Sequence, residues 1–170
     1  MSKYKYSYPK FEENVACAVG RDIGISFKQA IEITRNIRKK DLEKAQAYLQ
    51  RVIDMKEAVK FTRFTNGLGH KPGMASGRYP KTACKHILMI LNQAEANAQA
   101  KGLGRCKIIH ISAQQADKPM HSGRRPRLAM KRAHVEVVLQ EIEKKQDKKH
   151  KSKPAEPKQP TPIETKGEKK

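Results

Sequence analysis

Two strand-like runs in the second half of the chain are separated by a basic stretch far longer than a tight turn. Both runs, Lys107–Ala113 and His134–Gln140, alternate in the way that half-buried strands do. Antiparallel neighbours need only about two to five connecting residues. The intervening residues 118–132 instead hold six Lys or Arg and no carboxylate. Because like charges repel, such a stretch favours a polyanion lying against it. The sequence therefore predicts a basic hairpin presented to nucleic acid.

Strand alternation assigns side chains to the two faces of this pair. We expect Ile109 and Ile111 on one face of the first strand, and Ile108 and His110 on the other. The pairing also allows His110 and His134 to lie close together. Two histidines without a third ligand do not make a metal site, so neither a metal nor another cofactor is expected.

The overall charge narrows the class of partner. The chain has 37 Lys and Arg against 17 Asp and Glu, a formal net charge of +20, which favours nucleic acid or an anionic membrane. The longest apolar run, Ile87–Leu91, is far shorter than the roughly 20 residues of a spanning helix, and the N-terminus lacks an apolar signal segment. Three widely spaced cysteines without a C-x-x-C pair predict reduced thiols in a cytosolic protein.

Composition divides the chain into three parts. Residues 1–14 are an expected extended arm, whose aromatic side chains either stack on bases or pack on the domain; both interpretations stay open. Residues 15–142 are the expected globular domain, with the hairpin at about 116–133. Residues 143–170 carry ten Lys, five acids and four of the nine prolines with almost no apolar residues, so a disordered basic tail is expected.

Helical periodicity predicts three helices in the domain. Ser26–Gln29 fits a capping box, and the first helix should extend to about Ile37. Asp41 should cap the second helix. The third should begin near Thr82 and end before Gly102.

Two further features precede the second helix. Val15–Val19 is a candidate strand that Gly20 should end. Arg35, Arg38 and the Lys39–Lys40 pair crowd the end of the first helix. There they either match the helix dipole or contact phosphate, and both interpretations stay open.

The connection between the second and third helices has an unusual composition. From Ala58 to Ala94 there is no Asp or Glu, and aromatic residues are interleaved with cations. The glycines do not have P-loop or dinucleotide-binding spacing. Aromatic and basic side chains together suit RNA, whereas the alternative is an ordinary mobile surface loop. The predicted RNA-binding cations are Lys60, Arg63, Lys71, Arg78, Lys81 and Lys85 here and Lys118, Arg124, Arg125, Arg127, Lys131 and Arg132 in the hairpin.

Several segments jointly resemble one protein family. In chain order they are Gly20–Ile23, Ile25–Lys28, Arg63–His70, Gly77–Lys81, Asn92–Ala98, Gln114–Gln115, Arg124–Arg127 and His134–Val138. Over about residues 12–142 the chain resembles the universal twenty-two family of large-subunit ribosomal proteins, called seventeen in eukaryotes. The glycine-rich insert before the third helix is similar to the one in the archaeal and eukaryotic members of the family. Only Lys131, Arg132 and Ala133 join the arginine-rich arm to the strand that begins at His134. The hairpin is therefore shorter than is usual in that family.

The resemblance implies an α+β fold of three helices packed on a small three-stranded antiparallel sheet, with a projecting basic β-hairpin. It implies a structural constituent of the large ribosomal subunit that binds large-subunit rRNA near the peptide exit tunnel. The hairpin would extend toward the tunnel wall and support subunit assembly and translation. The cations that match the family's basic hairpin and insert are Arg124, Arg125, Arg127, Lys131 and Arg132, and Arg63, Arg78 and Lys81.

The expected partners follow from that resemblance. They are large-subunit rRNA and neighbouring ribosomal proteins, with the nascent peptide at the hairpin tip as a further candidate; neither a membrane nor a homo-oligomer is expected. The expected location is the cytoplasmic large subunit, with nucleolar assembly in a eukaryote. The alternative is a non-ribosomal basic RNA-binding module or RNA chaperone. No nucleophile–base pair, paired acids or phosphate loop stands out, so an enzyme is not expected.

Overall fold

A computed structural model of the protein describes residues 5–9, 14–124 and 127–142. The expected tail at 143–170 and much of the expected arm lie outside the described residues. The main sheet is antiparallel, with its last strand in the middle and the order β1-β6-β5. These strands are β1 (Val15–Ile23), β5 (Cys106–Gln115) and β6 (Ala133–Glu141).

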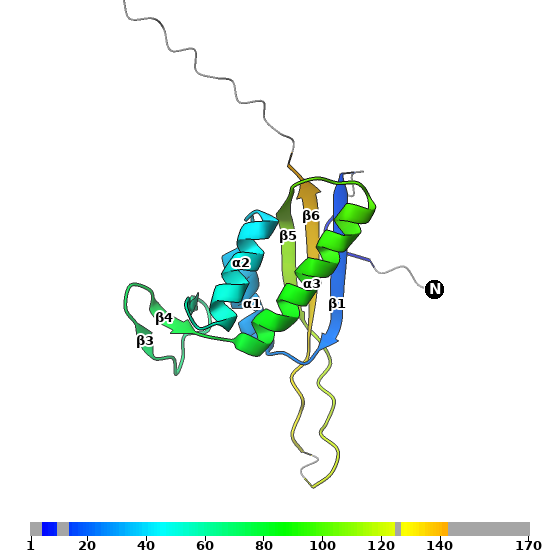
Figure 1. The fold of residues 1–170 in the computed structure, drawn as a ribbon. Coiled ribbons are helices and arrows are strands. Elements are labelled where there is room, and N and C mark those ends of the chain that lie inside the picture. The colour runs from blue at the N-terminus through cyan, green and yellow to red at the C-terminus, as the bar shows by residue number, and fades with distance from the viewer. Residues whose placement is uncertain (1–4, 10–13, 125–126, 143–170) are drawn as a thin grey trace, which may run out of the picture.

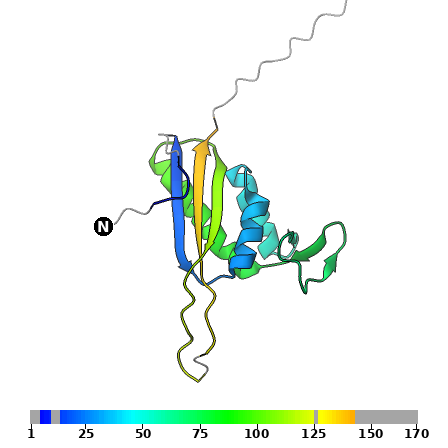
Figure 2. The same cartoon turned by 180° about the vertical axis from the view of Figure 1, so that it is seen from behind.

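Three helices pack against this sheet. They are α1 (Phe27–Ile37), α2 (Leu42–Ile53) and α3 (Lys81–Ala100). The longest, α3, crosses one face of the sheet over β1 and β6, and α2 lies beside it (Figure 1). The first helix runs along β5, as the reverse view shows (Figure 2). The predicted α+β fold, with three helices packed on a small three-stranded antiparallel sheet, is confirmed.

A second, smaller sheet lies in the acid-free connection between α2 and α3. Its strands are β2 (Val59–Lys60), β3 (His70–Lys71) and β4 (Ala75–Arg78), in the order β2-β4-β3. This insert, residues 59–80, projects sideways from the helices, away from β1 (Figure 1).

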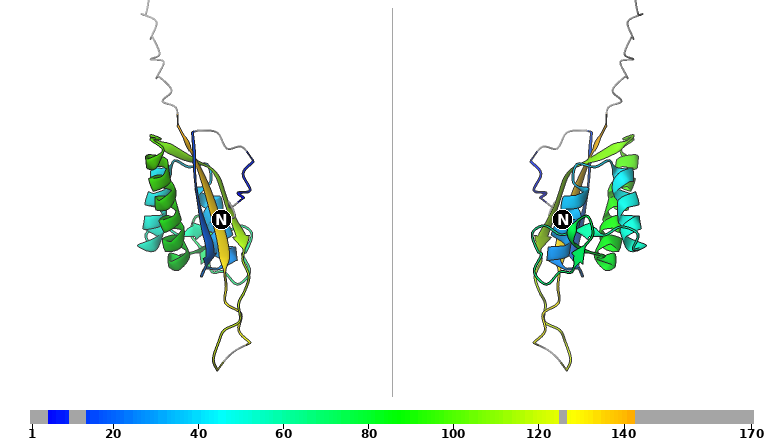
Figure 3. Two further views of the ribbon diagram at one scale, coloured as in Figure 1. Left: turned by 90° about the vertical axis from the view of Figure 1, so that its right-hand side faces the viewer. Right: turned by 90° about the vertical axis from the view of Figure 1, so that its left-hand side faces the viewer.

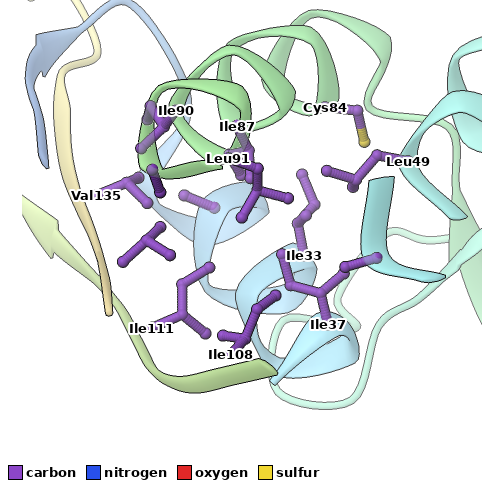
Figure 4. Close-up of a cluster of buried hydrophobic side chains, with 14 of the residues drawn as sticks. Ile33, Ile37, Leu49, Cys84, Ile87, Ile90, Leu91, Ile108, Ile111 and Val135 are labelled. Carbon is purple, nitrogen blue, oxygen red and sulfur yellow. The ribbon is translucent and has the colours of Figure 1, made fainter. Parts of the chain in front are cut away.

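The core forms where the helices meet the sheet (Figure 4). Apolar positions three or four residues apart on each helix give one buried stripe. Ile33 and Ile37 of α1 meet Ile87 and Leu91 of α3, and all four are fully buried. At about 25 cal/mol per Å² of apolar surface, such burial is the main term that favours this fold.

A β-bulge overturns the predicted faces of β5. The pairing with β6 shifts between Ile108 and His110, and both Ile108 and Ile111 are fully buried in the core. Ile109, which strict alternation placed with Ile111, is only half-buried. The extra residue of the bulge changes the phase of the strand, so the prediction was wrong on this point.

The first strand also continues past its expected end. Gly20 pairs with Val135 inside β1, and a register shift follows before Ile23. A Cβ at Gly20 would lie 2.6 Å from Cδ1 of Ile90, on α3. The glycine therefore allows the helix to approach the strand closely rather than ending the strand.

Helix ends agree with prediction in position more than in hydrogen bonding. Ser26 and Asp41 are the N-cap residues of α1 and α2, but neither side chain makes a cap hydrogen bond in the described structure. The Asp41 carboxylate instead lies 2.6 Å from Nζ of Lys44. Beyond the end of α3, Gly102 has a φ of 74°, the left-handed conformation predicted for it.

Candidate nucleic-acid interface

The basic hairpin lies beyond the ends of β5 and β6. Its two arms continue along the direction of these strands and project away from the main sheet (Figures 1 and 3). The N–H of His121 donates to the carbonyl of Leu128 at 2.7 Å, and that of Met130 donates to Pro119 at 2.8 Å. An isolated bridge joins the arms as well, but the described arms form no continuous ladder. The projecting hairpin is confirmed, with looser pairing than a regular strand pair.

Most of the predicted hairpin cations are exposed. The exposed ones are Lys118, Arg124, Arg127 and Lys131, and Arg125 lies outside the described residues. Arg132 is different, because its guanidinium donates to the carbonyl of Asp22 at 2.8 Å and is half-buried. This contact joins the base of the hairpin to the end of β1, so Arg132 has a structural role.

A buried carboxylate fixes the insert to α1. Glu32 is fully buried, and its oxygens accept the backbone N–H groups of Thr62, Arg63 and Phe64 at 3.2, 2.7 and 3.1 Å. Burial by itself would raise the pKa of Glu32, but the hydrogen bonds from Arg63, Thr62 and Phe64 outweigh burial and hold the pKa below its usual value. The ionised carboxylate therefore sets the course of the insert.

Other α1 side chains add to this attachment. Asn36 donates to the carbonyl of Lys60 at 3.0 Å, and Arg35 donates to the hydroxyl of Thr62 at 2.8 Å. Arg38 donates to the carbonyl of Ile111 at 3.1 Å. Arg35 and Arg38, at the end of α1, thus make contacts within the protein.

The predicted cations of the insert and of the first turns of α3 are mostly exposed. In the insert Lys60, Arg63 and Arg78 are exposed and Lys71 is half-buried, and in α3 Lys81 and Lys85 are exposed. The Lys71 ammonium lies 5.1 Å from the ring centroid of Tyr79, and Arg78 donates to the carbonyl of Gly67 at 3.2 Å. Within the described ranges, none of the predicted rRNA-binding cations forms an ion pair with a carboxylate.

The structure brings part of the insert and part of the hairpin together. Arg63 and Arg78 of the insert share one groove of about 500 Å³ with Lys131 at the base of the hairpin and with Lys28 of α1. Its other lining residues are Ser26, Gln29, Phe61, Phe64, Thr65, Asn66 and Leu68. Lys81, Lys85 and the described arginines near the hairpin tip are not part of this groove. We call it the junction groove.

Sequence analysis missed Lys28 and Glu32, which shape this interface, and Glu136, which holds the described part of the N-terminal arm. The two carboxylates share a signal. Glu32 is the only acid between Asp22 and Asp41, and Glu136 is the only acid between Asp117 and Glu141. A single acid within a cation-rich segment is therefore worth testing as a buried structural group.

Glu136 holds the described part of the N-terminal arm. Its carboxylate accepts from the hydroxyls of Ser112, at 2.6 Å, and Ser7. The described arm lies on the sheet face opposite α2 and α3 (Figure 3). The backbone N–H of Ser7 also donates to this carboxylate at 3.2 Å, and the ring of Tyr8 lies 5.8 Å from that of His110. Residues 5–9 thus pack on the domain, whereas Tyr4 and Phe11 lie outside the described residues.

The two strand histidines do not meet. His110 is paired with Val138, whereas His134 is paired with Gln114 and accepts from the N–H of Asp22 at 3.0 Å. The expectation that they could lie close together was wrong, because the register sets them several residues apart. In the part of the chain that the structure describes, no three His, Cys, Asp or Glu are grouped to hold a metal ion.

The thiols are not activated. Burial raises the pKa of the Cys84 thiol to about 12 and also raises the pKa values of Cys17 and Cys106. A nucleophilic cysteine requires the opposite shift. Among the described helices, none has both the length and the apolar character needed to cross a membrane.

Comparison with known proteins decides the family. Residues 18–140 match the family described as "Ribosomal protein L22p/L17e". The chain belongs to this family. It is 40% identical over 121 residues to the "Large ribosomal subunit protein uL22" of Archaeoglobus fulgidus, covering 68% of this chain and 78% of the relative. For the proteins of the same description from Ignicoccus hospitalis and Methanococcus aeolicus, identity is 39% over 147 residues and 37% over 152 residues.

The Ignicoccus and Methanococcus proteins are covered almost completely. The matches span 79% of this chain and 92% of the Ignicoccus protein, and 84% and 99% for the Methanococcus protein. The predicted resemblance is confirmed, and the relatives named here are archaeal, in line with the predicted branch. Membership of the L22p/L17e family gives the chain a structural role in the large ribosomal subunit.

Proposed function

We propose that this protein binds large-subunit rRNA through its insert and its hairpin, near the peptide exit tunnel, with the hairpin extending toward the tunnel wall. The observation that carries the proposal is the arrangement of cations. They project on two segments and meet at the junction groove, and none of the described ones is neutralised by a carboxylate. In isolation this arrangement costs free energy, whereas rRNA phosphates would neutralise it.

In the proposed mechanism, charge attraction supplies the affinity for rRNA, and the fixed positions of the cations set the orientation of the protein. Each phosphate that a Lys or Arg neutralises releases condensed counterions, so affinity falls steeply with salt. Arginine adds paired hydrogen bonds to phosphate or to a guanine edge. Fixed cations of the insert would set the orientation of the protein on rRNA, and the exposed hairpin cations would follow a longer stretch of backbone.

The proposed setting includes further partners. Neighbouring large-subunit proteins would surround the domain, and the nascent peptide is a candidate contact of the hairpin tip. Met120 and Leu128 on the described arms are 66% and 53% exposed, which gives the hairpin apolar as well as basic surface. The protein would act in the cytoplasmic ribosome as a single copy, after nucleolar assembly in a eukaryote.

The test compares two triple variants with the same change in charge. Replacing Arg124, Arg125 and Arg127 by Ala should leave thermal unfolding unchanged but strongly reduce incorporation into large subunits, measured by co-sedimentation of the tagged protein. The matched control replaces Lys44, Arg51 and Arg105, each of which is ion-paired to an acid. The control should incorporate like the wild type. Normal incorporation of the hairpin variant would remove the proposed role of the hairpin.

The same co-sedimentation experiment distinguishes a ribosomal constituent from the alternative, an RNA chaperone. A ribosomal constituent should co-migrate with the large subunit at about one copy per particle and remain there after a high-speed pellet is washed. A chaperone should distribute mostly into fractions lighter than the subunit.

A further inference from the structure

The junction groove is lined by three segments of the chain that are far apart in sequence. One wall is the first turn of α1 with Lys28, the second is the insert around Phe64, and the third is Lys131 at the base of the hairpin. Its volume of about 500 Å³ is within the usual range for a small-ligand site. It is therefore large enough for one nucleotide rather than for a stretch of duplex.

Positive charge surrounds an aromatic ring in this groove. Nζ of Lys28 lies 5.6 Å from the ring centroid of Phe64, and Cζ of Arg63 lies 5.4 Å from it. Arg78 and Lys131 also line the groove, and no carboxylate does so within the described ranges. A phosphate entering here would meet cations from α1, the insert and the hairpin at once.

Apolar and neutral polar groups complete the lining. Phe64 and Leu68 are half-buried, so each still offers apolar surface. Gln29 and Asn66 bring amide groups that can both donate and accept, and the Ser26 hydroxyl is not used as a helix cap in the described structure. A nucleotide needs these three kinds of contact: cations for the phosphate, an apolar surface for the base and amides for the base edge.

The groove is formed before any ligand binds. The Glu32 carboxylate fixes the backbone of residues 62–64, and the hydrogen bond from Arg78 to the carbonyl of Gly67 fixes the opposite side of the loop. Preformed sites bind more tightly because the cost of ordering is already met by folding.

We propose that the junction groove holds one unstacked nucleotide of single-stranded RNA, with its base against Phe64 and its phosphate among Lys28, Arg63 and Lys131. This inference rests on the proposed rRNA binding and deepens it, since it assigns recognition of a base to one place. An acidic peptide could satisfy the cations, but it would make no use of the aromatic surface and the two amides.

The test measures the binding of two short probes to the full-length protein. One is a five-nucleotide single-stranded RNA, and the other is an abasic oligomer of the same length and charge. The wild type should bind the RNA about tenfold more tightly than the abasic probe, because base–aromatic stacking is lost in the latter. Phe64→Leu should remove this preference and keep the salt dependence, whereas Tyr79→Leu, outside the groove, should keep both.

A second measurement avoids any variant. A 4-thiouridine in the same RNA, cross-linked by light to the wild-type protein, should attach to the peptide containing residues 63–68. Equal affinity for the two probes, or cross-linking confined to the hairpin, would overturn the groove proposal. The ribosomal role would still stand if the subunit incorporation experiment succeeded. Equally strong binding of a glutamate-rich peptide of matching charge would overturn it in favour of a protein partner.

Discussion

The insert and the hairpin are both basic, but the protein holds them differently. The insert is attached to α1 through Glu32 and Asn36, so its cations have a fixed base. The described hairpin arms are joined by a few backbone hydrogen bonds and lie away from the core. A cation on a fixed backbone loses only side-chain entropy when it binds phosphate, whereas a cation on a loose arm also loses backbone entropy. We infer that the insert sets orientation and the hairpin adapts to the RNA.

The insert and the hairpin are attached differently because of where the nearest carboxylates lie. The insert contains no acid, but Glu32 on the neighbouring helix accepts three of its backbone N–H groups. Residues 118–132 contain no acid, and the nearest, Asp117, is exposed. The buried Glu32 carboxylate thus explains why the insert is firmly attached to the domain while the described hairpin arms are only loosely paired.

The largest expected effect is the loss of Glu32. Glu32→Ala leaves three partly buried N–H groups without their acceptor. We expect a loss of about 3–5 kcal/mol in the free energy of unfolding, toward the lower end of the about 1–3 kcal/mol that each unsatisfied donor can cost. Glu32→Gln keeps one acceptor oxygen and should cost less. Urea unfolding followed by circular dichroism measures both.

The matched control is Glu43→Ala, because Glu43 forms an exposed ion pair with Arg105. We expect its removal to change the free energy of unfolding by less than about 1 kcal/mol. If Glu32→Ala were no more destabilising than this control, the insert would not depend on α1.

Acid should weaken the same attachment reversibly. The pKa of Glu32 is lower in the folded protein than its ordinary value of 4.5. Its contribution to stability is therefore present above the unfolded-state pKa and is lost as pH falls through the lower folded-state pKa. We expect the free energy of unfolding to decrease below about pH 4.5, and the wild-type curve to fall more steeply than that of Glu32→Gln. Parallel curves for the two proteins would contradict this.

Periodicity and charge were enough to predict the helices, the strands of the main sheet and the two basic regions. The pairing of those strands into one sheet came from the family resemblance, and the small sheet of the insert was not predicted. Periodicity and charge could not predict the bulge at Ile108, because an extra residue in a strand leaves no mark on composition. The junction groove was also hidden, since Lys28, Arg63 and Lys131 are far apart in sequence and only the tertiary fold brings them together. Glu32 was missed because a helix acid usually faces solvent.

A pair of glycines offers a smaller and more local comparison. Gly67 in the insert and Gly123 in the hairpin have φ values of 68° and 94°, and a Cβ at either would meet no atom within 4 Å among the described residues. Alanine in the left-handed region costs about 1 kcal/mol. We expect Gly67→Ala to lower the free energy of unfolding by about that amount, because the hydrogen bonds of the insert to α1 should make it unfold with the domain.

Gly123→Ala should leave the free energy of unfolding within about 0.3 kcal/mol of the wild type, because a loosely paired arm can relax around the new side chain. Thermal unfolding of both variants in one buffer measures the difference. Equal destabilisation by the two alanines would mean that the hairpin is as firmly held as the insert.

Two arginines of the hairpin itself allow a comparison at the scale of one hydrogen bond. Arg132 donates to the carbonyl of Asp22, whereas Arg124 is exposed near the tip. Arg132→Ala should therefore cost about 1 kcal/mol in the free energy of unfolding, the usual value of one hydrogen bond, and Arg124→Ala should cost almost nothing. Both remove one positive charge, so at low salt each also relieves some repulsion, and measuring at about 0.15 M salt limits that contribution. If both variants lost the same free energy of unfolding, Arg124 near the tip would hold the hairpin as firmly as Arg132 at its base. The contrast between the fixed insert and the adaptable hairpin arm would then not hold.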